Sequence, residues 1–305
     1  MSILIDADTT FIVQGITGRE AVNLTRECLD YGAGAKVVGG VTPGRKGREV
    51  HGVPVFDTVA QAVEHHGGPI TGSVVTVPPA FTKDAVLEAV ENGIELVVIV
   101  TERIPRRDVA EMVELASLRG ARIIGPNCLG IIVPDVIKMG GIGGPAKDAA
   151  KAYTPGTIGV ISRSGGMTTE MSSTLTAAGL GQSTAVSIGG DAIIGSAYAE
   201  LMPFFEADPE TQGIVIYTEP GGRMEAQLAD WQAENNSRLP IVAFMAGKFM
   251  DDESMKGMTF GHAGTIVEGK EDSATEKIKR LESAGITVVE RIDEIPDAVK
   301  ERIGA

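Results

Sequence analysis

Cysteine is scarce in this sequence, which contains two such residues, Cys28 and Cys128, far apart along the chain. There is no Cys-x-x-Cys pair and no Cys/His metal spacing. This pattern argues against both a disulfide framework and a zinc site. We therefore expect no metal ion held by this chain.

Long apolar runs are also absent. No stretch of about 18 apolar residues occurs, so the sequence predicts no transmembrane helix. The N-terminus has no basic segment followed by a long apolar one, a pattern that argues against an ordinary signal peptide. We therefore expect the protein to be cytoplasmic.

Aromatic residues make up 4% of the chain, and basic residues are outnumbered, with 27 Lys and Arg against 41 Asp and Glu. The resulting net charge of −14 would repel nucleic acid and anionic membranes unless a local basic patch prevails. Glycine, in contrast, is abundant: it makes up 39 of 305 residues, or about 13%, where about 7% is usual. This composition is typical of an α/β protein with many tight turns.

Short apolar runs alternate with helical stretches along the chain. The first such run covers residues 11–14 and is followed by a predicted helix over 19–31; the pattern continues to a strand over 122–125. A glycine-rich and polar stretch over 139–155 interrupts it, after which strands and helices resume. Such alternation predicts parallel sheets with crossover helices. We expect two doubly wound domains, residues 1–150 and 151–305.

A glycine turn lies between the first predicted strand and the first predicted helix. Gly15 and Gly18 would let the backbone approach a phosphate, and the helix start beginning with Arg19 would supply aimed N–H groups. A third glycine is absent, with Ala21 in its place. The alternative is a glycine turn that binds no ligand.

Two cations follow the second predicted strand, where a domain that binds NAD has an acidic residue. Arg45 and Lys46 suit a ligand with an additional phosphate, either NADP or the 3′-phosphate of coenzyme A (CoA). The alternative is a solvated basic turn. Residues Val100–Glu102 end a later strand at the same predicted sheet edge, where ligands of α/β proteins bind, although a plain loop fits them equally well.

His262 differs from the other three histidines because it lies in a glycine-flanked segment, residues 260–266. Such flanks would leave the ring accessible to a large partner, and a ring nitrogen is a competent nucleophile toward phosphorus at neutral pH. Glu219 ends a predicted strand and is a candidate to orient this ring. The alternatives are a loop histidine with capping glycines and a glutamate that caps the next helix.

A second candidate anion cradle lies at the start of a helix in the second domain, where Ser164 precedes Gly165 and Gly166. The serine also suggests a nucleophile. However, the G-x-S-x-G elbow is absent and nothing supplies a Ser/His/Asp pattern, which argues against serine hydrolysis.

Taken together, these segments resemble the α subunit of succinyl-CoA synthetase over nearly the whole chain. The resemblance rests on six short motifs in the same order: Met1–Asp6, Gly15–Gly18, Gly39–Gly44, Gly125–Cys128, Ile188–Asp191 and Gly261–Gly264. It implies a Rossmann-like CoA-binding domain followed by a flavodoxin-like ligase domain. It also implies that His262 is a phosphohistidine and that Glu219 holds it.

The resemblance further assigns the CoA-contacting positions, which are Thr17, Gly18, Arg19, Glu20, Arg45, Val100, Thr101 and Glu102. Lys46 competes with Arg45, because the lysine usual in that region is displaced. The sequence contains no P-loop. By resemblance, the ATP or GTP site with its Mg²⁺ lies on an ATP-grasp β subunit, and the two chains form a heteromer.

This sequence departs from the resemblance in the region expected to hold the acid. Gly166 stands where the synthetase has threonine, Thr169 replaces a tyrosine that contacts the substrate, and Pro220 replaces an apolar residue. The run from Ser164 is more similar to ATP-citrate lyase and citryl-CoA synthetase. We therefore expect the acid to be succinate or a larger acid such as citrate.

Two other functions compete with the acid–CoA ligase. An NADP-dependent oxidoreductase would explain Arg45, but it leaves the second domain without a role and lacks a residue set for hydride transfer. A CoA-binding regulator without catalysis would explain the first domain and leave His262 unused. Ligand titration separates the first alternative from the ligase, and phosphate labelling separates the second.

Overall fold

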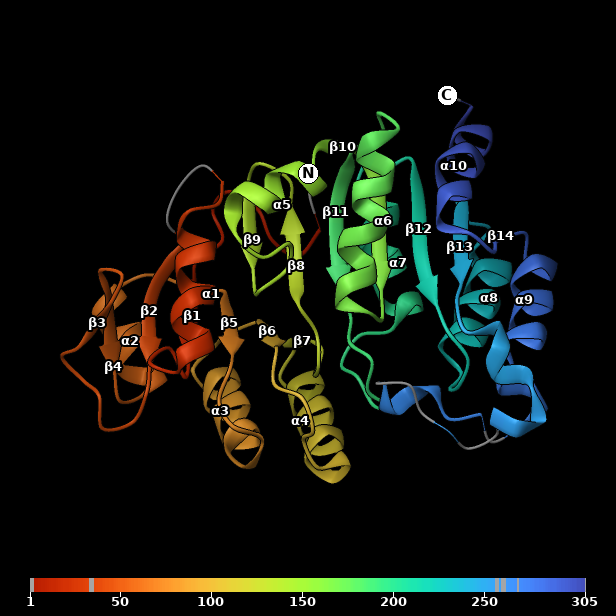
Figure 1. The fold of residues 1–305 in the computed structure, drawn as a ribbon. Coiled ribbons are helices and arrows are strands. Elements are labelled where there is room, and N and C mark those ends of the chain that lie inside the picture. Colours follow the sequence, from red (N-terminus) through yellow and green to blue (C-terminus); the bar gives the residue numbers. More distant parts are fainter. Residues whose placement is uncertain (1–2, 33–35, 256–257, 259–261, 268, 305) are drawn as a thin grey trace.

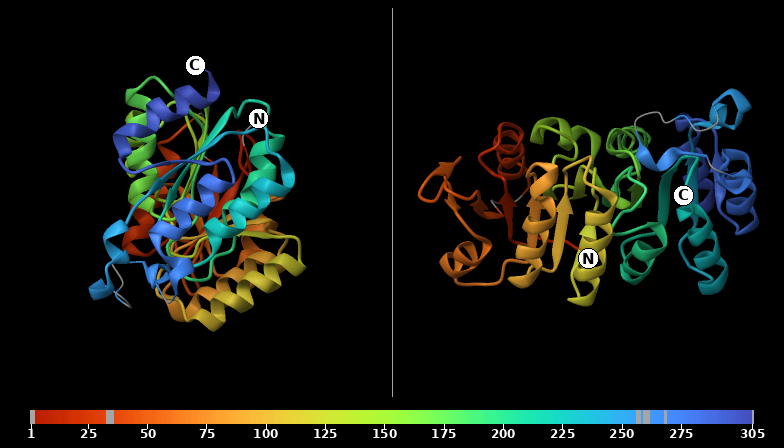
Figure 2. Two further views of the ribbon diagram at one scale, coloured as in Figure 1. Left: turned by 90° about the vertical axis from the view of Figure 1, so that its right-hand side faces the viewer. Right: turned by 90° about the horizontal axis from the view of Figure 1, so that it is seen from below.

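The computed structural model describes residues 3–32, 36–255, 258, 262–267 and 269–304. Two mostly parallel sheets stand side by side in it, one formed by the N-terminal part of the chain and one by the C-terminal part (Figure 1). Helices cover both faces of the sheets (Figure 2). The predicted α/β class with two domains is confirmed. The motif segments that begin at Met1 and at Gly261 lie partly outside the described residues.

The first sheet has the strand order β3-β4-β2-β1-β5-β6-β7. Its strands are β1 (Phe11–Gln14), β2 (Val37–Val41), β3 (Glu49–Val50), β4 (Val53–Phe56), β5 (Gly72–Val75), β6 (Leu96–Ile99) and β7 (Arg122–Ile124). The helices of this part are α1 (Arg19–Leu29), α2 (Val59–His66), α3 (Pro79–Glu91) and α4 (Arg106–Leu118). The order reverses at β1, which pairs with β2 on one side and β5 on the other, and ligands of open α/β sheets bind at such a switch point.

The second sheet has the order β14-β13-β12-β10-β11-β8-β9. Its strands are β8 (Gly130–Val133), β9 (Ile137–Met139), β10 (Pro155–Ser162), β11 (Gln182–Ser187), β12 (Gly213–Thr218), β13 (Ile241–Met245) and β14 (Thr287–Val289). Its helices are α5 (Ala146–Ala152), α6 (Gly165–Ala177), α7 (Tyr198–Ala207), α8 (Met224–Asn235), α9 (Ala274–Ser283) and α10 (Ile295–Ile303). Short 3₁₀ turns, η1 (Lys248–Asp251), η2 (Glu253–Met255), η3 (Ala263–Thr265), η4 (Lys270–Asp272) and η5 (Ile292–Glu294), complete it.

Both sheets are mostly parallel, as predicted, and each has antiparallel strands added at one edge. β3 pairs antiparallel with β4, and β8 pairs antiparallel with both β9 and β11. The chain therefore passes to the second sheet between β7 and β8, earlier than the boundary predicted at residue 150. The stretch over 139–155, where the sequence showed a break in the alternation, begins at the end of the β8–β9 hairpin and contains α5.

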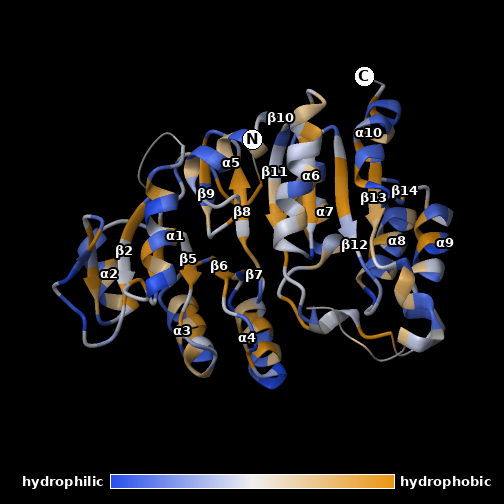
Figure 3. Cartoon of the chain, in the orientation of Figure 1, coloured by the Kyte–Doolittle hydropathy of each residue, from blue (hydrophilic) through white to orange (hydrophobic). Residues whose placement is uncertain are grey.

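The β8–β9 hairpin packs between the two halves of the molecule. Cys28 of α1 donates from its thiol to the carbonyl of Gly140 just after β9, and a Cβ at Gly72 of β5 would lie 2.7 Å from the Met139 methyl. One hydrophobic cluster accordingly includes buried residues of both sheets, such as Val13 and Val186. Strands of both sheets carry hydrophobic colours in Figure 3.

Candidate functional site

The first candidate site lies at the carboxyl end of β1, where the chain turns into α1. Gly15 has φ +85°, and a Cβ there would lie 2.9 Å from the Thr76 hydroxyl, so a side chain would be strained and crowded. Gly18 is the extended N-cap of α1, and no side chain caps the helix. The first amides of α1 are thus available to an anion.

A pocket of about 660 Å³ opens beside this turn. It is lined by Gln14, Gly15, Thr17, Gly18, Val41, Thr42, Pro43, Thr76, Val77, Pro78, Phe81, Asp84, Ala85 and Glu88. Phe81 is 62% exposed, which leaves an aromatic face on the pocket wall. A volume of this size and a mixture of apolar walls with helix-start amides suit a large ligand that carries phosphate.

The basic turn after β2 is held by a carboxylate. Asp57 Oδ1 accepts hydrogen bonds from the amides of Arg45 at 3.0 Å and Lys46 at 3.1 Å. Both basic side chains are exposed. The turn therefore presents two cations next to Pro43, which lines the pocket.

The other predicted CoA positions are divided between two places. Arg19 and Glu20 form an ion pair with each other at the start of α1, with side chains 92% and 81% exposed. Thr101 donates from its hydroxyl to the carbonyl of Val77 at 2.7 Å, beside the pocket. Val100 is half-buried, and Glu102 lines a smaller cavity of about 200 Å³ toward the second sheet.

The second candidate site centres on His262, near the carboxyl end of β12. Its Nδ1 lies 2.8 Å from Glu219 Oε2 and 2.9 Å from Oε1. The Glu219 side chain is 5% exposed, whereas the His262 side chain is 26% exposed. A carboxylate on Nδ1 favours the tautomer with its proton there, which leaves the Nε2 lone pair free to attack.

Three glycines allow the chain to enclose this histidine closely. A Cβ at Gly190 would lie 2.5 Å from the His262 ring, and one at Gly221 would lie 2.4 Å from the Gly264 carbonyl oxygen. A Cβ at Gly264 would lie 2.2 Å from Arg163 Nη2. The sequence interpretation had the glycines beside His262 opening the ring outward. Of these, Gly264 packs against Arg163 and Gly261 lies outside the described residues, and the access of the ring to a large partner stays a prediction.

Arg163 and Tyr217 extend the environment of Glu219. Arg163 Nε lies 3.3 Å from Glu219 Oε1, and its side chain is 1% exposed. Burial, together with the charge of Glu219, raises the pKa of the Tyr217 hydroxyl well above its usual value. The sequence analysis assigned no role to Arg163. Its position between the end of a predicted strand and a serine at a helix start was the feature that could have indicated a site residue.

The segment from Ser164 forms the start of α6, as the sequence predicted, whereas its use as an anion cradle and the acid contacts stay predictions. Ser164 is the N-cap, and its hydroxyl accepts from the Met167 amide at 3.5 Å. Gly165 packs against Leu129, while Gly166 is exposed with open space where a side chain would lie. Thr169 is engaged elsewhere, because its hydroxyl lies 2.9 Å from the hydroxyl of buried Tyr153.

A side-chain contact joins the two sites. Asn127, in the loop between β7 and β8, donates from Nδ2 to Asp191 Oδ1 at 3.0 Å, and its amide donates to the carbonyl of Thr101. Asp191 directly follows Gly190, which packs under His262. Asn127 and Asp191 both line the 200 Å³ cavity with Glu102.

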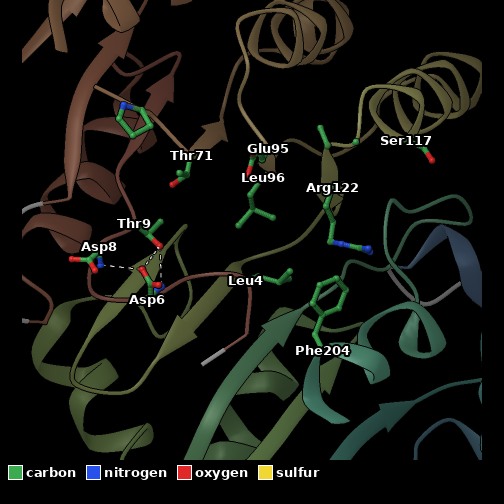
Figure 4. Close-up of a pocket in the computed structure, with 13 residues that line it drawn as sticks. Leu4, Asp6, Asp8, Thr9, Thr71, Glu95, Leu96, Ser117, Arg122 and Phe204 are labelled. Atoms are coloured by element: carbon green, nitrogen blue, oxygen red, sulfur yellow. Dashed lines mark hydrogen bonds between the residues drawn. The ribbon is translucent and has the colours of Figure 1, made fainter. Parts of the chain in front are cut away.

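A further pocket of about 700 Å³ lies at the opposite, amino-terminal edge of the first sheet (Figure 4). Leu96 and Arg122, which begin β6 and β7, line it together with Phe204 of α7. The Arg122 guanidinium lies 4.6 Å from the Phe204 ring centroid, a cation–π contact between the two halves. This pocket is remote from both candidate sites.

In the described part of the chain, no group of three or more His, Cys, Asp or Glu side chains is arranged to hold a metal ion. Burial raises the pKa of Cys28 to about 11 and that of Cys128 to about 12, so both are protonated thiols at neutral pH. None of the described helices is both long enough and apolar enough to cross a membrane.

A phosphate-suited pocket in one α/β domain and a carboxylate-held histidine in the next define a class of two-domain ligase subunits that bind CoA. Comparison with protein families agrees with this class. Residues 6–103 match the CoA-binding domain, and residues 155–301 match the flavodoxin-like domain of succinyl-CoA ligases. The predicted Rossmann-like and flavodoxin-like domains are thereby confirmed.

Full-length relatives identify the family. The chain is 40% identical over 302 residues to the α subunit of ADP-forming succinate–CoA ligase from Methanothermobacter thermautotrophicus, covering 99% of this chain and 97% of the relative. It is 42% identical to the α subunit 2 from Archaeoglobus fulgidus, covering 99% of each. The chain belongs to the family of succinate–CoA ligase α subunits, and it is an enzyme subunit of the acid–thiol ligase class.

Solved structures share the fold. ATP citrate lyase from Methanothrix soehngenii, determined with citrate and coenzyme A, superposes with a TM-score of 0.91 at 23% identity. The match covers 99% of this chain and 50% of that one, so this chain spans about half of the lyase. A dinucleotide-forming acetyl-coenzyme A synthetase from Ca. Korarchaeum cryptofilum superposes with a TM-score of 0.71 at 20% identity, covering 96% of this chain and 60% of that one.

Proposed function

We propose that this chain is the phosphoryl-carrying α subunit of a nucleoside-triphosphate-dependent acid–CoA ligase. The observation that carries the proposal is the 2.8 Å contact between His262 Nδ1 and the buried carboxylate of Glu219. A ring held in this way keeps Nε2 as the nucleophile, and the carboxylate stabilises the positive charge that the ring gains on phosphorylation.

The reaction then proceeds in three balanced steps. His262 Nε2 attacks the γ-phosphorus, the bond to the bridging oxygen breaks, and the nucleoside diphosphate leaves with that electron pair. A carboxylate oxygen of the acid next attacks the phosphorus, and the N–P electron pair returns to Nε2, which gives an acyl phosphate. Finally the CoA sulfur attacks the acyl carbon, the thiol proton passes to the departing phosphate, and the thioester forms.

The remaining site residues have binding roles in this proposal. The amides at Gly165 and Gly166 stabilise the transferring phosphoryl oxygens, with Ser164 capping their helix. CoA occupies the pocket of about 660 Å³ at Thr17 and Gly18. Its 3′-phosphate pairs with Arg45 or Lys46, and Arg19, Glu20 and the segment Val100–Glu102 complete its surroundings.

The nucleotide site is proposed to lie on a second chain. The relatives are named α subunits of ADP-forming ligases, which supports a β subunit as the partner of this chain too. We assign to that partner an ATP-grasp module that binds ATP or GTP with Mg²⁺. The heteromer would work in the cytoplasm.

Two acids are candidates for the substrate. The relatives' names favour succinate, whereas the open space at Gly166 favours a larger acid such as citrate. Thr169, which was expected to enlarge the acid pocket, is turned to Tyr153 instead. The enlargement therefore rests on Gly166, and succinate and citrate both stay candidates.

Reconstitution with a β subunit tests the function. The complex should convert a carboxylic acid, CoA and ATP or GTP into a thioester, and labelled γ-phosphate should appear on the α chain as an acid-labile, base-stable adduct. A chain that binds CoA and is never labelled would be a CoA-binding regulator. Tighter binding of NADP than of CoA would favour the oxidoreductase.

A further inference from the structure

Four buried charged side chains lie together beneath His262, and Glu219 alone among them has been given a role. Arg163 follows β10, Glu219 follows β12, Glu225 is on α8 and Lys277 is on α9. Their side chains are between 1% and 5% exposed. Two cations and two anions out of water are costly unless each is well paired, so their arrangement needs an explanation.

Lys277 holds the segment that carries Glu219. Its ammonium donates to Glu225 Oε2 at 2.6 Å, to the main-chain carbonyl of Glu219 at 3.0 Å, and to the carbonyl of Gly221. These bonds use all three N–H donors of the ammonium. The backbone on both sides of Pro220 is thereby fixed to α9, the helix that follows the His262 segment in sequence.

Arg163 forms a buried ion pair with the side chain of Glu219. Its Nε lies 3.3 Å from Glu219 Oε1, and its Nη1 donates to the carbonyl of Gly221 at 3.4 Å. The charges of Glu225 and Glu219 outweigh burial and raise the pKa of Arg163 above its ordinary value. The guanidinium thus lies among two carboxylates and the backbone at Gly264, where a Cβ would collide with Nη2.

We propose that Arg163 and Lys277 are positioning residues that act through Glu219 on the tautomer of His262. Arg163 keeps the carboxylate turned to Nδ1, and the Lys277–Glu225 pair keeps its backbone in place. The proton of His262 then stays on Nδ1 and the lone pair on Nε2. This inference rests on the proposed phosphohistidine, but the tautomer can be measured without any phosphoryl transfer.

The first experiment is ¹⁵N NMR of the histidine-labelled chain, with the His262 signals identified by their loss in His262→Ala. The wild-type ring should show its proton on Nδ1. Arg163→Met should give a mixture of tautomers, and Arg163→Lys, which keeps a cation, should restore much of the wild-type signal. Arg238→Met is the matched control, because Arg238 also donates to several carbonyls, including that of Asp208, but at the far edge of the same sheet.

The second experiment measures phosphorylation of His262 in the complex with a β subunit. Arg163→Met should lower the rate roughly tenfold to a hundredfold, as loss of a charged contact does. CoA affinity should be unchanged. Lys277→Met combined with Glu225→Gln removes the second pair without leaving a buried charge, and this variant should also lower the rate while it stays folded.

The outcomes separate the two proposals. If the wild-type chain is never phosphorylated, the proposed function is refuted. If Arg163→Met nevertheless loses the single tautomer seen in the wild type, this inference stands. A folded Arg163→Met chain with the wild-type tautomer would overturn the inference, even if phosphorylation were slow. If Arg163→Met does not fold, two other variants are used. A wild-type tautomer and phosphorylation rate in the Lys277→Met/Glu225→Gln variant would overturn the role of that pair. Arg163→Lys would decide the role of the arginine.

Discussion

At the scale of single residues, the site depends as much on what is missing from the backbone as on the histidine itself. Gly190, Gly221 and Gly264 each lie where a Cβ would be within 2.5 Å of another atom of the site. Such distances are far below van der Waals contact. The glycines therefore set how closely three segments approach His262, and each can be tested by adding one methyl group.

Gly190→Ala should displace the His262 ring, because its Cβ would lie 2.5 Å from ring carbons. We expect phosphorylation to fall at least tenfold, measured as labelled phosphate per chain. Gly269→Ala is the control, since nothing lies within 4 Å of that Cβ and Gly269 has no left-handed φ that alanine would strain. Equal losses in both variants would contradict the steric argument.

His262→Ala should abolish the phosphoenzyme and the overall reaction while CoA still binds. The proposed CoA pocket belongs to the first sheet, and His262 does not line it. Phosphate labelling and CoA titration of the same preparation check the two halves of the prediction. Residual phosphorylation above a few per cent in the variant would exclude His262 as the sole carrier.

His262 and Glu219 could be predicted from the sequence because each adjoins a glycine run, and Glu219 follows a strand. The resemblance supplied their roles. Arg163 and Lys277 could not be assigned in this way. Lys277 bonds to a carbonyl 58 residues away, and no local pattern marks a lysine that will be buried. Long-range packing, rather than spacing, determines these partners.

At the scale of elements, the turn after β2 shows how a short segment is prepared for an anion. Asp57 binds the amides of Arg45 and Lys46, so the backbone is ordered while both side chains are free to reach outward. The sequence predicted these two cations at the end of a strand, because charge and strand order are local signals. The sequence did not determine which of the two side chains binds the 3′-phosphate.

Arg45→Ala should weaken CoA binding more than dephospho-CoA binding. A charged contact to phosphate is worth about 1.5–3 kcal/mol, which corresponds to roughly tenfold to a hundredfold in affinity. Calorimetric titration of both ligands measures the difference, and Lys46→Ala is compared beside it. Equal losses for the two ligands in both variants would show that neither residue reads the 3′-phosphate.

The start of α6 carries the prediction about the acid. Threonine at Gly166 fills open space, so Gly166→Thr should shift kcat/KM toward succinate relative to citrate in the reconstituted complex. Thr169→Tyr should add less, because Thr169 is bonded to Tyr153 and a larger ring must displace that contact. A wild-type complex that already prefers succinate strongly over larger acids would refute the enlarged pocket.

The elements that sequence analysis missed are short and depend on pairing. β8 and β9 form an antiparallel hairpin before the glycine-rich stretch, and α5 lies within it. Predicted strands such as β1 and β7 are equally short, but those strands alternate with crossover helices. β8 and β9 follow each other in a hairpin, so the alternation of strand and helix does not mark them, and their sheet is decided by which core they join.

At the scale of the whole molecule, side-chain contacts join the two sheets at both ends of their strands. At the carboxyl edge Asn127 bonds to Asp191, between the CoA pocket and His262. At the amino edge Arg122 donates to Ser196 at 3.2 Å and lies against Phe204. In the proposed mechanism, an acyl phosphate made at one site must reach a thiol bound at the other. The carboxyl-edge contact should therefore matter for transfer rather than for either binding event.

Asp191→Ala should lower thioester formation about tenfold, the cost of one charged hydrogen bond, while CoA affinity and His262 phosphorylation stay near wild type. Asn127→Gly removes the same bond from the other side and suits the φ of +54° at that position. Arg122→Met is the matched control, since it removes an inter-sheet contact at the edge remote from the chemistry. The three steps are measured separately by calorimetry, phosphate labelling and thioester assay. If Arg122→Met reduced thioester formation as much as Asp191→Ala, the effect would come from loosened sheets, and the Asn127–Asp191 contact would have no specific part in transfer.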